Sequence, residues 1–437
     1  MIIYDKIAAQ LPAWRERVGK LVKNYGSAKV SEVTVEQIFS GIRGVEIQVS
    51  DISVVDPQEG IRIRGYTIPE LLELLPKAPG TRYPLAGGVF YLLMTDEMPS
   101  LDQAMEVEAE WKARSRVPVY VYELIRAMPP CAHPMTMFAQ ALLALNCEGV
   151  FAERYAAGMQ KSEYWKATLE DSLNLTAKLP NIAAFIYNLR FKDGRQVRPD
   201  PTLDWSANFA NMLVPGDKDY QDLMRLFIML HSDHEGANVS AHTSYLVNSA
   251  LSDVYYSSSA AMCGLAGPLH GLANQECLRW LLSVRDHFGG LPTEEQLRKF
   301  AQDTIKSGQV IPGYGHAVLR ATDPRFTAQM EFGQQEFPDD EIFCLAKMVY
   351  EVVPQVLIDT GKVKNPWPNV DALNGTMQYH YGVREWDFYT VLFGVSRTLG
   401  LTSHAVWARA LGKPIERPKS LTTNQLEEML GLPPGGK

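Results

Sequence analysis

Two histidines and one aspartate lie in separate segments that are rich in glycine and proline. His270 lies in AGPLHGLANQE, His316 in VIPGYGHAVLRATDPRF and Asp371 in GKVKNPWPNVDALNG. A histidine can donate or accept a proton near neutral pH, and a carboxyl group in apolar surroundings has a raised pKa and can act as a base. These residue types, displayed on loops, suit general acid–base catalysis.

Each of these residues also has a purely structural interpretation. His270 follows a Gly-Pro break, and a helical pattern restarts after Gly271, so we expect His270 at or beside a helix N-terminus. The helix dipole there disfavours imidazolium, and a neutral ring can donate a hydrogen bond to a developing enolate oxygen. Alternatively, His270 only caps a helix, His316 lies in an ordinary surface turn, and Asp371 is the N-cap of the next helix.

Positively charged residues beside these loops suit an anionic substrate. Arginine binds a carboxylate through two parallel hydrogen bonds, and lysine attracts a phosphate as a point charge. Two arginines follow His316 and two lysines precede Asp371: Arg320, Arg325, Lys362 and Lys364. In a chain with a formal net charge of −8, local positive charge favours a small polyanion, although solvated surface side chains are the alternative.

Two later arginines have no partner that the sequence identifies. Arg397 interrupts the apolar helical run FYTVLFGVSRTLG. A charge on an apolar helix is costly unless it is paired, so we expect Arg397 to face a carboxylate from the protein or from a ligand. Arg417, in a loop near the C-terminus, has the same ambiguity.

Three histidines, His231, His234 and His242, fall in the short segment HSDHEGANVSAH. Histidines at this density can bind a metal ion, but the segment matches neither H-E-x-x-H nor H-x-x-E-H. Recognition of an anion and packing as hydrogen-bonded core histidines are the other two interpretations.

The elements that must position these residues are mostly helices. Apolar residues recur with helical spacing in Pro134–Asn146, Asp219–His231 and Gly271–Arg285. Alternating strand patterns are confined to Glu46–Val55 and Gly60–Tyr66, which can form a small hairpin. The alternation of strands and helices typical of a parallel sheet is absent, so the sequence predicts a large all-α protein.

Composition excludes several classes of protein. The chain has 437 residues, 46% of them hydrophobic, which fits a globular protein of about two large or three smaller domains. Its acidic balance argues against a nucleic-acid-binding protein. Five cysteines without a C-x-x-C motif argue against a disulfide framework, and no apolar run approaches the roughly 18 residues of a membrane span. Asp5 and Glu16 favour a first helix of the mature protein over a transit peptide.

Ordered segments along nearly the whole chain resemble the citrate synthase family, in particular its dimeric type from mitochondria and some bacteria. Besides the three loops above, the resemblance is carried by VDPQEGIRIRGYTIPE, PLAGGVFYLLMT, HSDHEGANVSAHTS, VLFGVSR and RPKS. It implies an all-α fold, the citrate synthase fold, with a minor β-hairpin near the N-terminus. Residues 1–270 and 380–437 would form a large helical domain with the dimer interface and the oxaloacetate site, and residues 271–379 a smaller inserted helical domain for coenzyme A and the catalytic base.

The resemblance also implies a reaction. The enzyme would be an acyltransferase that condenses acetyl-CoA with oxaloacetate and hydrolyses citryl-CoA to citrate, the entry step of the tricarboxylic acid cycle, without a metal ion or other cofactor. His270 would hydrogen bond the thioester carbonyl, Asp371 would remove a methyl proton, and His316 would protonate the new alkoxide. The implied ligands of the oxaloacetate carboxylates are His234, Arg325, Arg397 and, from the other subunit, Arg417.

A further set of residues is implied for binding coenzyme A. These are Arg43, Lys161, Val310, Gly313, Tyr314, Arg320, Lys362, Lys364 and Asn369. Lys161 departs from the family pattern, which has an arginine that contacts a coenzyme A phosphate. Lysine keeps the charge and loses the two-pronged geometry of the guanidinium, so the affinity for coenzyme A is expected to differ.

Other functions remain as alternatives. A 2-methylcitrate synthase acting on propionyl-CoA differs by one methylene, which discriminates substrates by only about 1–3 kcal/mol. A metallohydrolase built on the histidine cluster and a catalytically inert helical scaffold are the others. Reacting groups on separate loops predict domain closure. We expect a homodimer without nucleic-acid or membrane partners, located in the mitochondrial matrix if it is a processed eukaryotic protein and in the cytoplasm if it is bacterial.

Overall fold

The structure is a computed structural model of the 437-residue chain, and it describes residues 1–316, 318–361, 363, 365–433 and 435. Lys362 and Lys364, two of the predicted coenzyme A contacts, lie outside the described residues. The described residues form an almost entirely helical protein, as the sequence predicts, with one small sheet.

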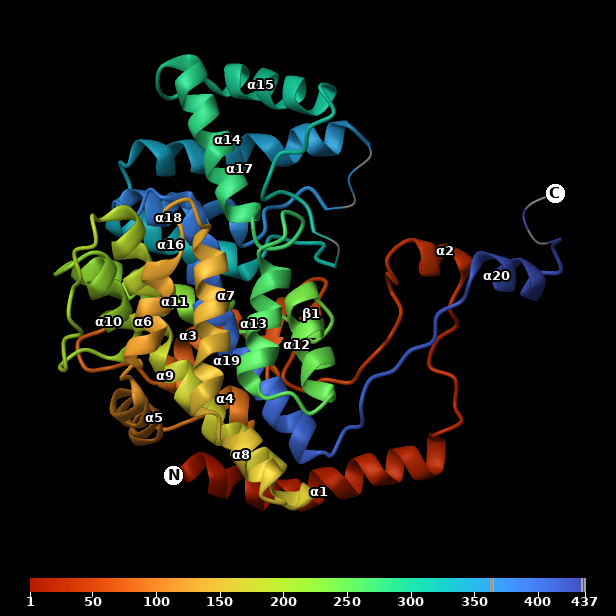
Figure 1. Cartoon of the computed structure of the whole chain (residues 1–437). Helices are drawn as coiled ribbons and strands as arrows, with labels where there is room; N and C mark the ends of the chain where they lie inside the picture. The colour runs from red at the N-terminus through yellow and green to blue at the C-terminus, as the bar shows by residue number, and fades with distance from the viewer. Residues whose placement is uncertain (317, 362, 364, 434, 436–437) are drawn as a thin grey trace.

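Most helices belong to one large body, which we call the main body (Figure 1). Its elements are α1 (Ile2–Tyr25), α3 (Ile68–Leu74), α4 (Ala86–Thr95), α5 (Leu101–Arg114), α6 (Val119–Ala127), α7 (Pro134–Ala144), η1 (Leu145–Glu148), α8 (Val150–Ala156), η2 (Lys161–Glu163), α9 (Tyr164–Phe191), α10 (Trp205–Leu213), α11 (Lys218–His231), α12 (Val239–Ser249), α13 (Val254–Leu265), η3 (Trp386–Phe388) and α19 (Tyr389–Ala410). The predicted helical patterns at Pro134–Asn146 and Asp219–His231 correspond to α7 with η1 and to α11.

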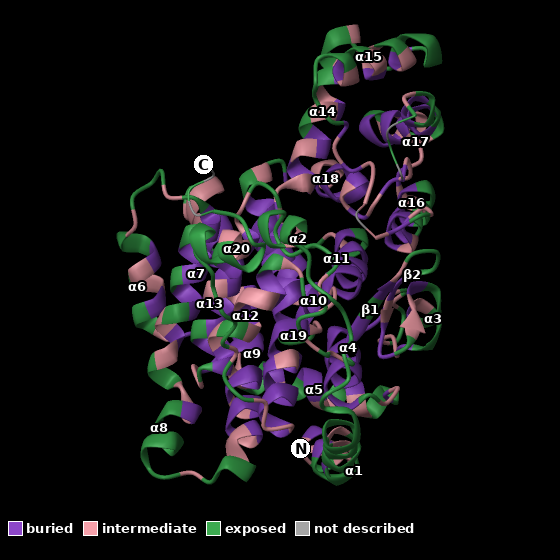
Figure 2. Cartoon of the chain, turned by 90° about the vertical axis from the view of Figure 1, so that its right-hand side faces the viewer, coloured by how far each residue is buried: buried purple, intermediate pink, exposed green. Residues whose placement is uncertain are grey.

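Two long helices, α9 and α19, pack against each other in the centre of the main body. Nearly all residues of α19 and most residues of α9 are buried, because a helix that is apolar on all sides is stable only when other helices surround it. Figure 2 shows this buried centre and the exposed outer faces of α1 and of α15 (Glu294–Lys306). Arg397 lies in the middle of α19 and is therefore fixed deep in the main body.

A second group of helices, which we call the small unit, stands at one end of the main body (Figures 1 and 2). It comprises α14 (Ala273–Phe288), α15 (Glu294–Lys306), α16 (Pro324–Glu336), α17 (Glu341–Asp359) and α18 (Asp371–His380). These helices pack mainly on one another, and α16 also contacts α11 of the main body. The pattern predicted at Gly271–Arg285 corresponds to α14.

The sheet is antiparallel and has the order β1 (Ser53–Asp56), β2 (Gly60–Ile63), β3 (Tyr66–Thr67). The register pairs Ser53 with Ile63 and Asp56 with Gly60. The predicted strand at Glu46–Val55 is wrong in its first half, because residues 46–52 form no strand. β2 ends at Ile63, where Arg64 and Gly65 turn the chain with positive φ angles, so the residues before Ser53 have no partner strand.

Two arms, residues 26–50 and 411–433, extend away from the main body and carry the short helices α2 (Val35–Phe39) and α20 (Thr423–Met429) (Figure 1). Apolar side chains on both arms are exposed, including Val30 at 83%, Phe39 at 72% and Met429 at 72% of their surface. Exposed apolar residues in such number are typical of an interaction surface.

No single helix in the described part of the chain is long and apolar enough to cross a membrane; the bent pair Pro134–Glu148 and Val150–Ala156, at 41°, passes by length and composition alone.

Candidate active site

Side chains from both parts of the molecule meet where the small unit adjoins the main body. The main body contributes the loop after α11, the turn after α13 and the middle of α19, and the small unit contributes the loop before α16 and the start of α18. The ring centres of His234 and His316 lie 5.9 Å apart. Arg325 or Arg397 acts electrostatically on each of His234, His270, His316 and Asp371, so the site is built around two guanidinium groups.

His270 lies in the turn between α13 and α14. Its Nε2 accepts a hydrogen bond from the backbone N–H of Ser240 at 3.3 Å and lies 2.9 Å from the Ser240 hydroxyl oxygen. His270 lies just before α14, whose N-cap is Leu272, as predicted, and its ring also contacts Ser240 in the first turn of α12. Burial, together with Arg397, lowers the pKa of His270 to about 4. The ring is therefore neutral and carries its hydrogen on Nδ1.

His316 has the opposite arrangement of its ring nitrogens. Its Nδ1 accepts the backbone N–H groups of Val318 and Leu319 at 3.0 and 3.1 Å. Burial, helped by Arg325, lowers the pKa of His316. The neutral ring therefore carries its hydrogen on Nε2, and this N–H is the group that can donate to a ligand. The backbone bonds fix the ring, in contrast to the solvated surface turn that was the alternative interpretation.

Asp371 is the first residue of α18, and its backbone N–H donates to Asn369 Oδ1 at 3.0 Å. The N-cap position is Val370, so the alternative prediction that Asp371 caps this helix is wrong. Burial raises the pKa of Asp371 to about 6, while Arg325 and Arg397 oppose this rise. A carboxyl group with a pKa near neutrality is suited to removing a proton from a weak carbon acid.

The loops that carry His316 and Asp371, residues 310–316 and 365–371, are joined by backbone hydrogen bonds; we call them the paired loops. Gly315 N–H donates to the Trp367 carbonyl at 3.0 Å, and Asn369 N–H donates to the Gly313 carbonyl at 2.9 Å. The Asn369 side chain also donates to the Gly315 carbonyl at 3.0 Å. These bonds hold the two catalytic candidates of the small unit at a fixed separation.

Gly313 has a positive φ of 77°, and a Cβ atom there would lie 2.6 Å from Cys277 Sγ. Only glycine fits this close approach. Of the predicted coenzyme A contacts, Gly313, Tyr314 and Asn369 belong to the paired loops. Val310 begins the same loops and is 80% exposed. Arg320 lies on the surface beyond them, where its backbone N–H donates to the Pro57 carbonyl at 2.7 Å.

Arg325 and Asp323 form a buried ion pair at the start of α16, with 2.8 Å between Nη2 and Oδ2. Asp323 is also the N-cap of α16 and accepts the backbone N–H of Val370 at 3.2 Å. Arg325 lowers the pKa of the Asp323 carboxyl against the effect of burial. The pair therefore fixes α16 to the loop that precedes Asp371.

Arg397 has no comparable partner. Its Nε donates to the backbone carbonyl of His231 at 3.2 Å, and its guanidinium lies 4.7 Å from the ring centre of Phe393. In the part of the chain that the structure describes, Arg397 forms no ion pair, so the predicted carboxylate partner is not supplied by these protein residues. Burial lowers the pKa of Arg397 to about 10, and the group still carries its charge at neutral pH.

The three clustered histidines do not converge. His231 Nδ1 donates to the Phe227 carbonyl at 2.9 Å, and His242 Nε2 lies 2.8 Å from Glu416 Oε1. Of the three, only His234 lies near His316, whereas both His231 and His234 interact electrostatically with Arg325 and Arg397. Among the residues described, no three histidine, cysteine or acidic side chains form a possible metal site. Burial and hydrogen bonding therefore explain His231, the contact with Glu416 explains His242, and recognition of an anion remains for His234.

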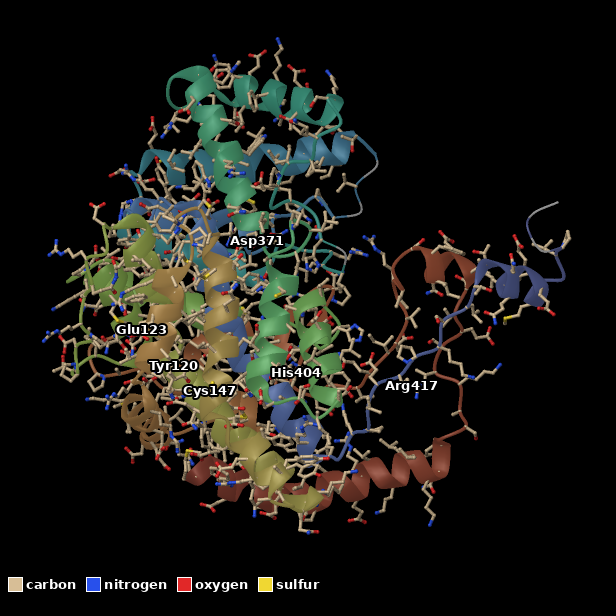
Figure 3. All side chains as sticks on the ribbon, in the orientation of Figure 1. Tyr120, Glu123, Cys147, Asp371, His404 and Arg417 are labelled. Atoms are coloured by element: carbon tan, nitrogen blue, oxygen red, sulfur yellow. The ribbon has the colours of Figure 1, made fainter. Side chains whose placement is uncertain are left out.

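Three predicted site residues lie elsewhere in the single chain. Arg417 is exposed on the C-terminal arm, far from Asp371 (Figure 3). Arg43 is exposed after α2 on the other arm, where its carbonyl accepts the side chain of Gln37. Lys161 lies next to Gly412, beyond the C-terminal end of α19, and at 1.5 Å per residue this end is about 20 Å along the helix from Arg397.

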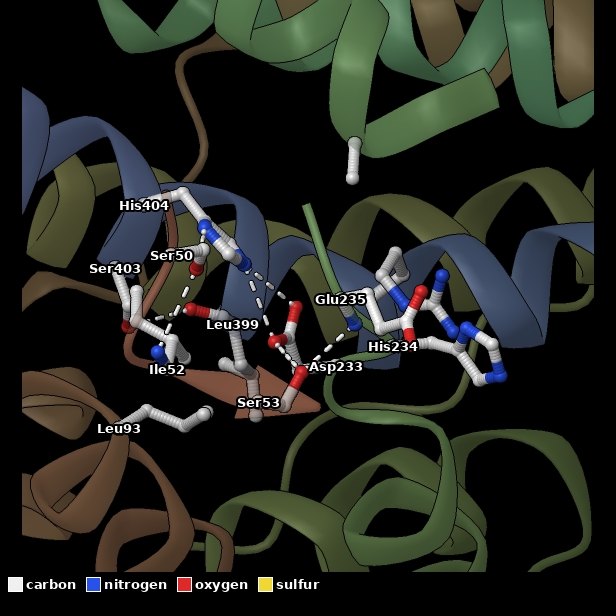
Figure 4. A network of polar contacts seen from close by, with 12 residues as sticks. Ser50, Ile52, Ser53, Leu93, Asp233, His234, Glu235, Leu399, Ser403 and His404 are labelled. Atoms are coloured by element: carbon white, nitrogen blue, oxygen red, sulfur yellow. Dashed lines mark hydrogen bonds and ion pairs between the residues drawn. The ribbon is translucent and has the colours of Figure 1, made fainter. Parts of the chain in front are cut away.

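A buried polar network holds the loop that carries His234 (Figure 4). His404 Nε2 lies 3.1 Å from both carboxylate oxygens of Asp233, and the Ser53 hydroxyl donates to the same carboxylate at 2.5 Å. Ser53 in turn accepts the backbone N–H of Glu235 at 2.7 Å. The network thus fixes the residues on both sides of His234.

Sequence patterns did not identify the residues that support the site, which include Ser240, Asp323, Asp233 and His404. Asp233 and Asp323 each lie within two residues of a predicted ligand, and that proximity was the only available signal. Ser53 and His404 are 180 and 171 residues from Asp233, so no local pattern connects them.

The chain is similar to known proteins along nearly its whole length. A family profile described as "Citrate synthase, C-terminal domain" matches residues 41–419. The chain is 52% identical over 427 residues to the "Probable citrate synthase, mitochondrial" of Glossina morsitans morsitans, covering 98% of this chain and 92% of that protein. It is 49% identical over 432 residues to the "Citrate synthase, mitochondrial" of Xiphias gladius, covering 99% and 92%.

Solved structures share the fold. The crystal structure of citrate synthase from Pyrobaculum aerophilum matches with a TM-score of 0.76 at 27% identity, covering 88% of this chain and 92% of that chain. The ternary complex of carboxymethyl coenzyme A and oxaloacetate with the citrate synthase of Thermoplasma acidophilum matches with a TM-score of 0.75, covering 90% and 97%; at 19% identity it shows the fold alone.

Proposed function

The chain belongs to the citrate synthase family and catalyses the condensation of acetyl-CoA with oxaloacetate, and we propose that the groups described above perform this reaction. The observation that carries the assignment of roles is the opposite tautomers of two neutral histidines that share the two site arginines with a buried carboxyl group of raised pKa. His270 offers Nδ1–H, His316 offers Nε2–H, and Asp371 offers a base.

In the first step, Asp371 removes a proton from the methyl group of acetyl-CoA. A methyl group beside a thioester is a weak acid, so the developing oxyanion needs a donor. His270 supplies it through Nδ1–H, held in place by Ser240. A fixed donor in a site that excludes water contributes about 3–4 kcal/mol to such a transition state.

In the second step, the enolate carbon attacks the ketone carbonyl of oxaloacetate. His234, Arg325 and Arg397 hold the two carboxylates, and the uncompensated charge of Arg397 attracts the dianion. His316 donates its Nε2 proton to the alkoxide as the new carbon–carbon bond forms. Water then cleaves the thioester of citryl-CoA in the same cavity, which releases citrate and coenzyme A.

Coenzyme A is proposed to bind along the paired loops at Val310, Gly313, Tyr314 and Asn369, with Arg320 at their outer edge. Lys362 and Lys364 adjoin the same loops in sequence. Because the paired loops also carry His316 and Asp371, binding of acetyl-CoA along them would place its acetyl group beside the base.

We also propose that the active form is a homodimer. The arms expose apolar side chains that a second chain can cover, and Arg417, Arg43 and Lys161 lie outside the site of their own chain. A two-fold arrangement would allow an arm to bring Arg417 to the oxaloacetate site of the partner. A division at residues 271–379 is proposed for the moving domain, since the small unit lies within this range and closure would exclude water from the reaction.

Propionyl-CoA is not favoured as the acyl donor, because the relatives described above are citrate synthases. Those two relatives are mitochondrial proteins, which supports the mitochondrial matrix as the proposed location. No step requires a metal ion or a further cofactor.

Release of the coenzyme A thiol tests the reaction. With acetyl-CoA and oxaloacetate together, the purified protein is expected to release thiol rapidly, and omission of oxaloacetate should abolish release. Propionyl-CoA should be the poorer substrate. Thiol release that does not depend on oxaloacetate would indicate a simple thioesterase and contradict the proposal.

A further inference from the structure

His231 is buried and takes no direct part in the chemistry above, yet it contacts both halves of the site. It is the last residue of α11, in the main body. Its ring Nε2 lies 2.8 Å from Asn374 Nδ2, and Asn374 belongs to α18 of the small unit. Asn374 lies one helical turn after Asp371 on the same helix, and its side chain favours the ionised form of the Asp371 carboxyl. One hydrogen bond between the two parts of the molecule and the Asn374 side chain therefore link the main body to the base.

The directions of the hydrogen bonds at His231 and Asn374 are determined by the partner groups. The carbonyl of Phe227 can only accept, so His231 Nδ1 donates to it at 2.9 Å. His231 Nε2 must then accept from the Asn374 amide. The Asn374 oxygen accepts from Gln329 Nε2 on α16, which leaves the second N–H of the amide for Asp371.

The ring of His231 cannot easily turn away from this arrangement. It stacks on Phe227 with 4.2 Å between ring centres and meets Phe393 edge-on at 5.3 Å. Burial lowers the pKa of His231 to about 3, so the ring stays neutral across the working pH range and Nε2 stays an acceptor. Asn374 and Gln329 are also almost completely buried.

The backbone of the same residue reaches the oxaloacetate half of the site. The His231 carbonyl accepts the Nε–H of Arg397, and His234 follows three residues later in the loop. One residue thus contacts the proposed dicarboxylate ligand Arg397 through its backbone and the proposed base through its ring and Asn374.

We propose that His231 and Asn374 are positioning residues that orient the Asp371 carboxyl and tie it to the arginine that binds oxaloacetate. The proposal rests on the proposed role of Asp371 as the base. Neither residue touches a substrate; each acts by restricting the rotation of the carboxyl group. Misplacement of a reacting group by about 1 Å can lower a rate about a hundredfold.

The test compares three variants of the intact protein by the kinetics of both substrates. His231→Phe keeps the stacked ring and removes both hydrogen bonds, Asn374→Leu removes the amide at similar volume, and His231→Gln restores an acceptor near the position of Nε2. In the first two variants we expect kcat to fall by about 10- to 100-fold with little change in KM for oxaloacetate. His231→Gln should recover part of the loss.

The pH dependence of kcat/KM for acetyl-CoA separates positioning from packing. Asn374 donates to the ionised carboxyl and so favours the charged form of Asp371. Its removal should raise the pKa of Asp371 and move the acid limb of the profile to higher pH. The other groups that face Asp371 stay in place: Asp323 and Arg325 at the start of α16, Arg397 on α19 and Cys277 on α14.

Tyr220→Phe is the matched control. Tyr220 also lies on α11, is fully buried, and donates its hydroxyl to Gln378 of α18 at 2.7 Å, so this variant removes a buried bond between the same two helices without touching Asp371. It should keep the wild-type acid limb. The positioning proposal is overturned if His231→Phe and Asn374→Leu behave like Tyr220→Phe, while a wild-type protein that shows no condensation would instead overturn the proposed function.

Discussion

The two halves of the active site hold their buried arginines in different ways. In the main body, Arg397 has one hydrogen bond to a backbone carbonyl and, among the residues described, no ion pair. In the small unit, Arg325 is paired with Asp323 at 2.8 Å. A buried charge without a counter-ion costs stability, whereas a buried pair with further hydrogen bonds offsets much of that cost.

The difference separates two tasks. In the main body, Asp233 acts on Arg397 only from a distance and forms no direct ion pair with it, so a dicarboxylate that binds there would supply the missing direct partner. In the small unit Arg325 already has a direct partner, Asp323 is also bonded to the loop before Asp371, and the paired loops fix the positions of the proposed base and proton donor. The main body is thus suited to attracting the dicarboxylate, and the small unit is suited to holding the proposed catalytic groups in a fixed geometry.

The largest effect is expected when the base is neutralised. Asp371→Asn should lower kcat by about 10²- to 10⁴-fold, because the proton acceptor is lost. Oxaloacetate affinity, measured by calorimetry, should remain near the wild-type value, because Asp371 does not hold that substrate. A comparable loss of oxaloacetate binding would show that the two halves do not divide the tasks.

Replacement of the two arginines should have different effects on the stability of the ligand-free protein. Arg397→Met should weaken oxaloacetate binding by about 2–5 kcal/mol and leave the free protein as stable as before or more stable, since an uncompensated charge is removed. Arg325→Met should lower the free energy of unfolding by about 3–5 kcal/mol, because Asp323 is left buried without its partner. Urea denaturation without ligand measures the free energy of unfolding of both variants. Equal destabilisation would contradict the proposed difference between the two buried arginines.

Mixed dimers test whether the arm completes the site of a second chain. Asp371→Asn and Arg417→Ala dimers should each be nearly inactive. Random reassembly of an equal mixture should restore about a quarter of wild-type activity, because half of the dimers contain one intact site of two. Activity that stays at the level of the separate variants would place Arg417 in its own chain's site or outside any site.

A smaller effect is expected on the pH dependence of stability. His231 and His270 have pKa values lowered to about 3 and about 4 from 6.5, so the unfolded chain binds more protons below pH 6.5 and acid should destabilise the fold. Asp371, raised from 3.8 to about 6, acts in the opposite direction between these values. Glu108 and Asp171, whose pKa values burial raises to about 8 and about 7, act in the same direction as Asp371. The contribution of His231 is therefore measured by comparison: acidification from pH 7 to 5 should change the free energy of unfolding less favourably in the wild type than in His231→Phe.

The sequence predicts the helical class and identifies the loops that meet at the candidate site, because both signals are local. The apolar spacing of α11 and the glycine–proline breaks around His270 and His316 lie within short windows. The extra length of the predicted strand at Glu46–Val55 was wrong because a strand also needs a partner, and β2 ends at Ile63.

Tautomers and partners were not predictable from the sequence. The tautomer of His270 is determined by Ser240, which is 30 residues away. The lack of a direct ion pair at Arg397, among the described residues, depends on the packing of α19 against α11. His231 and His234 look equivalent in the sequence. The structure separates them, since His231 points into an aromatic pocket and His234 faces His316.

Exchange of the acetyl-CoA methyl hydrogens in deuterated water is the most direct test of the central claim that Asp371, which belongs to the small unit, removes the proton. With malate in place of oxaloacetate, no ketone is present and condensation cannot follow. The wild-type protein is expected to exchange the methyl hydrogens, and Asp371→Asn, saturated with malate, is expected not to. Exchange at the wild-type rate in Asp371→Asn would contradict the account.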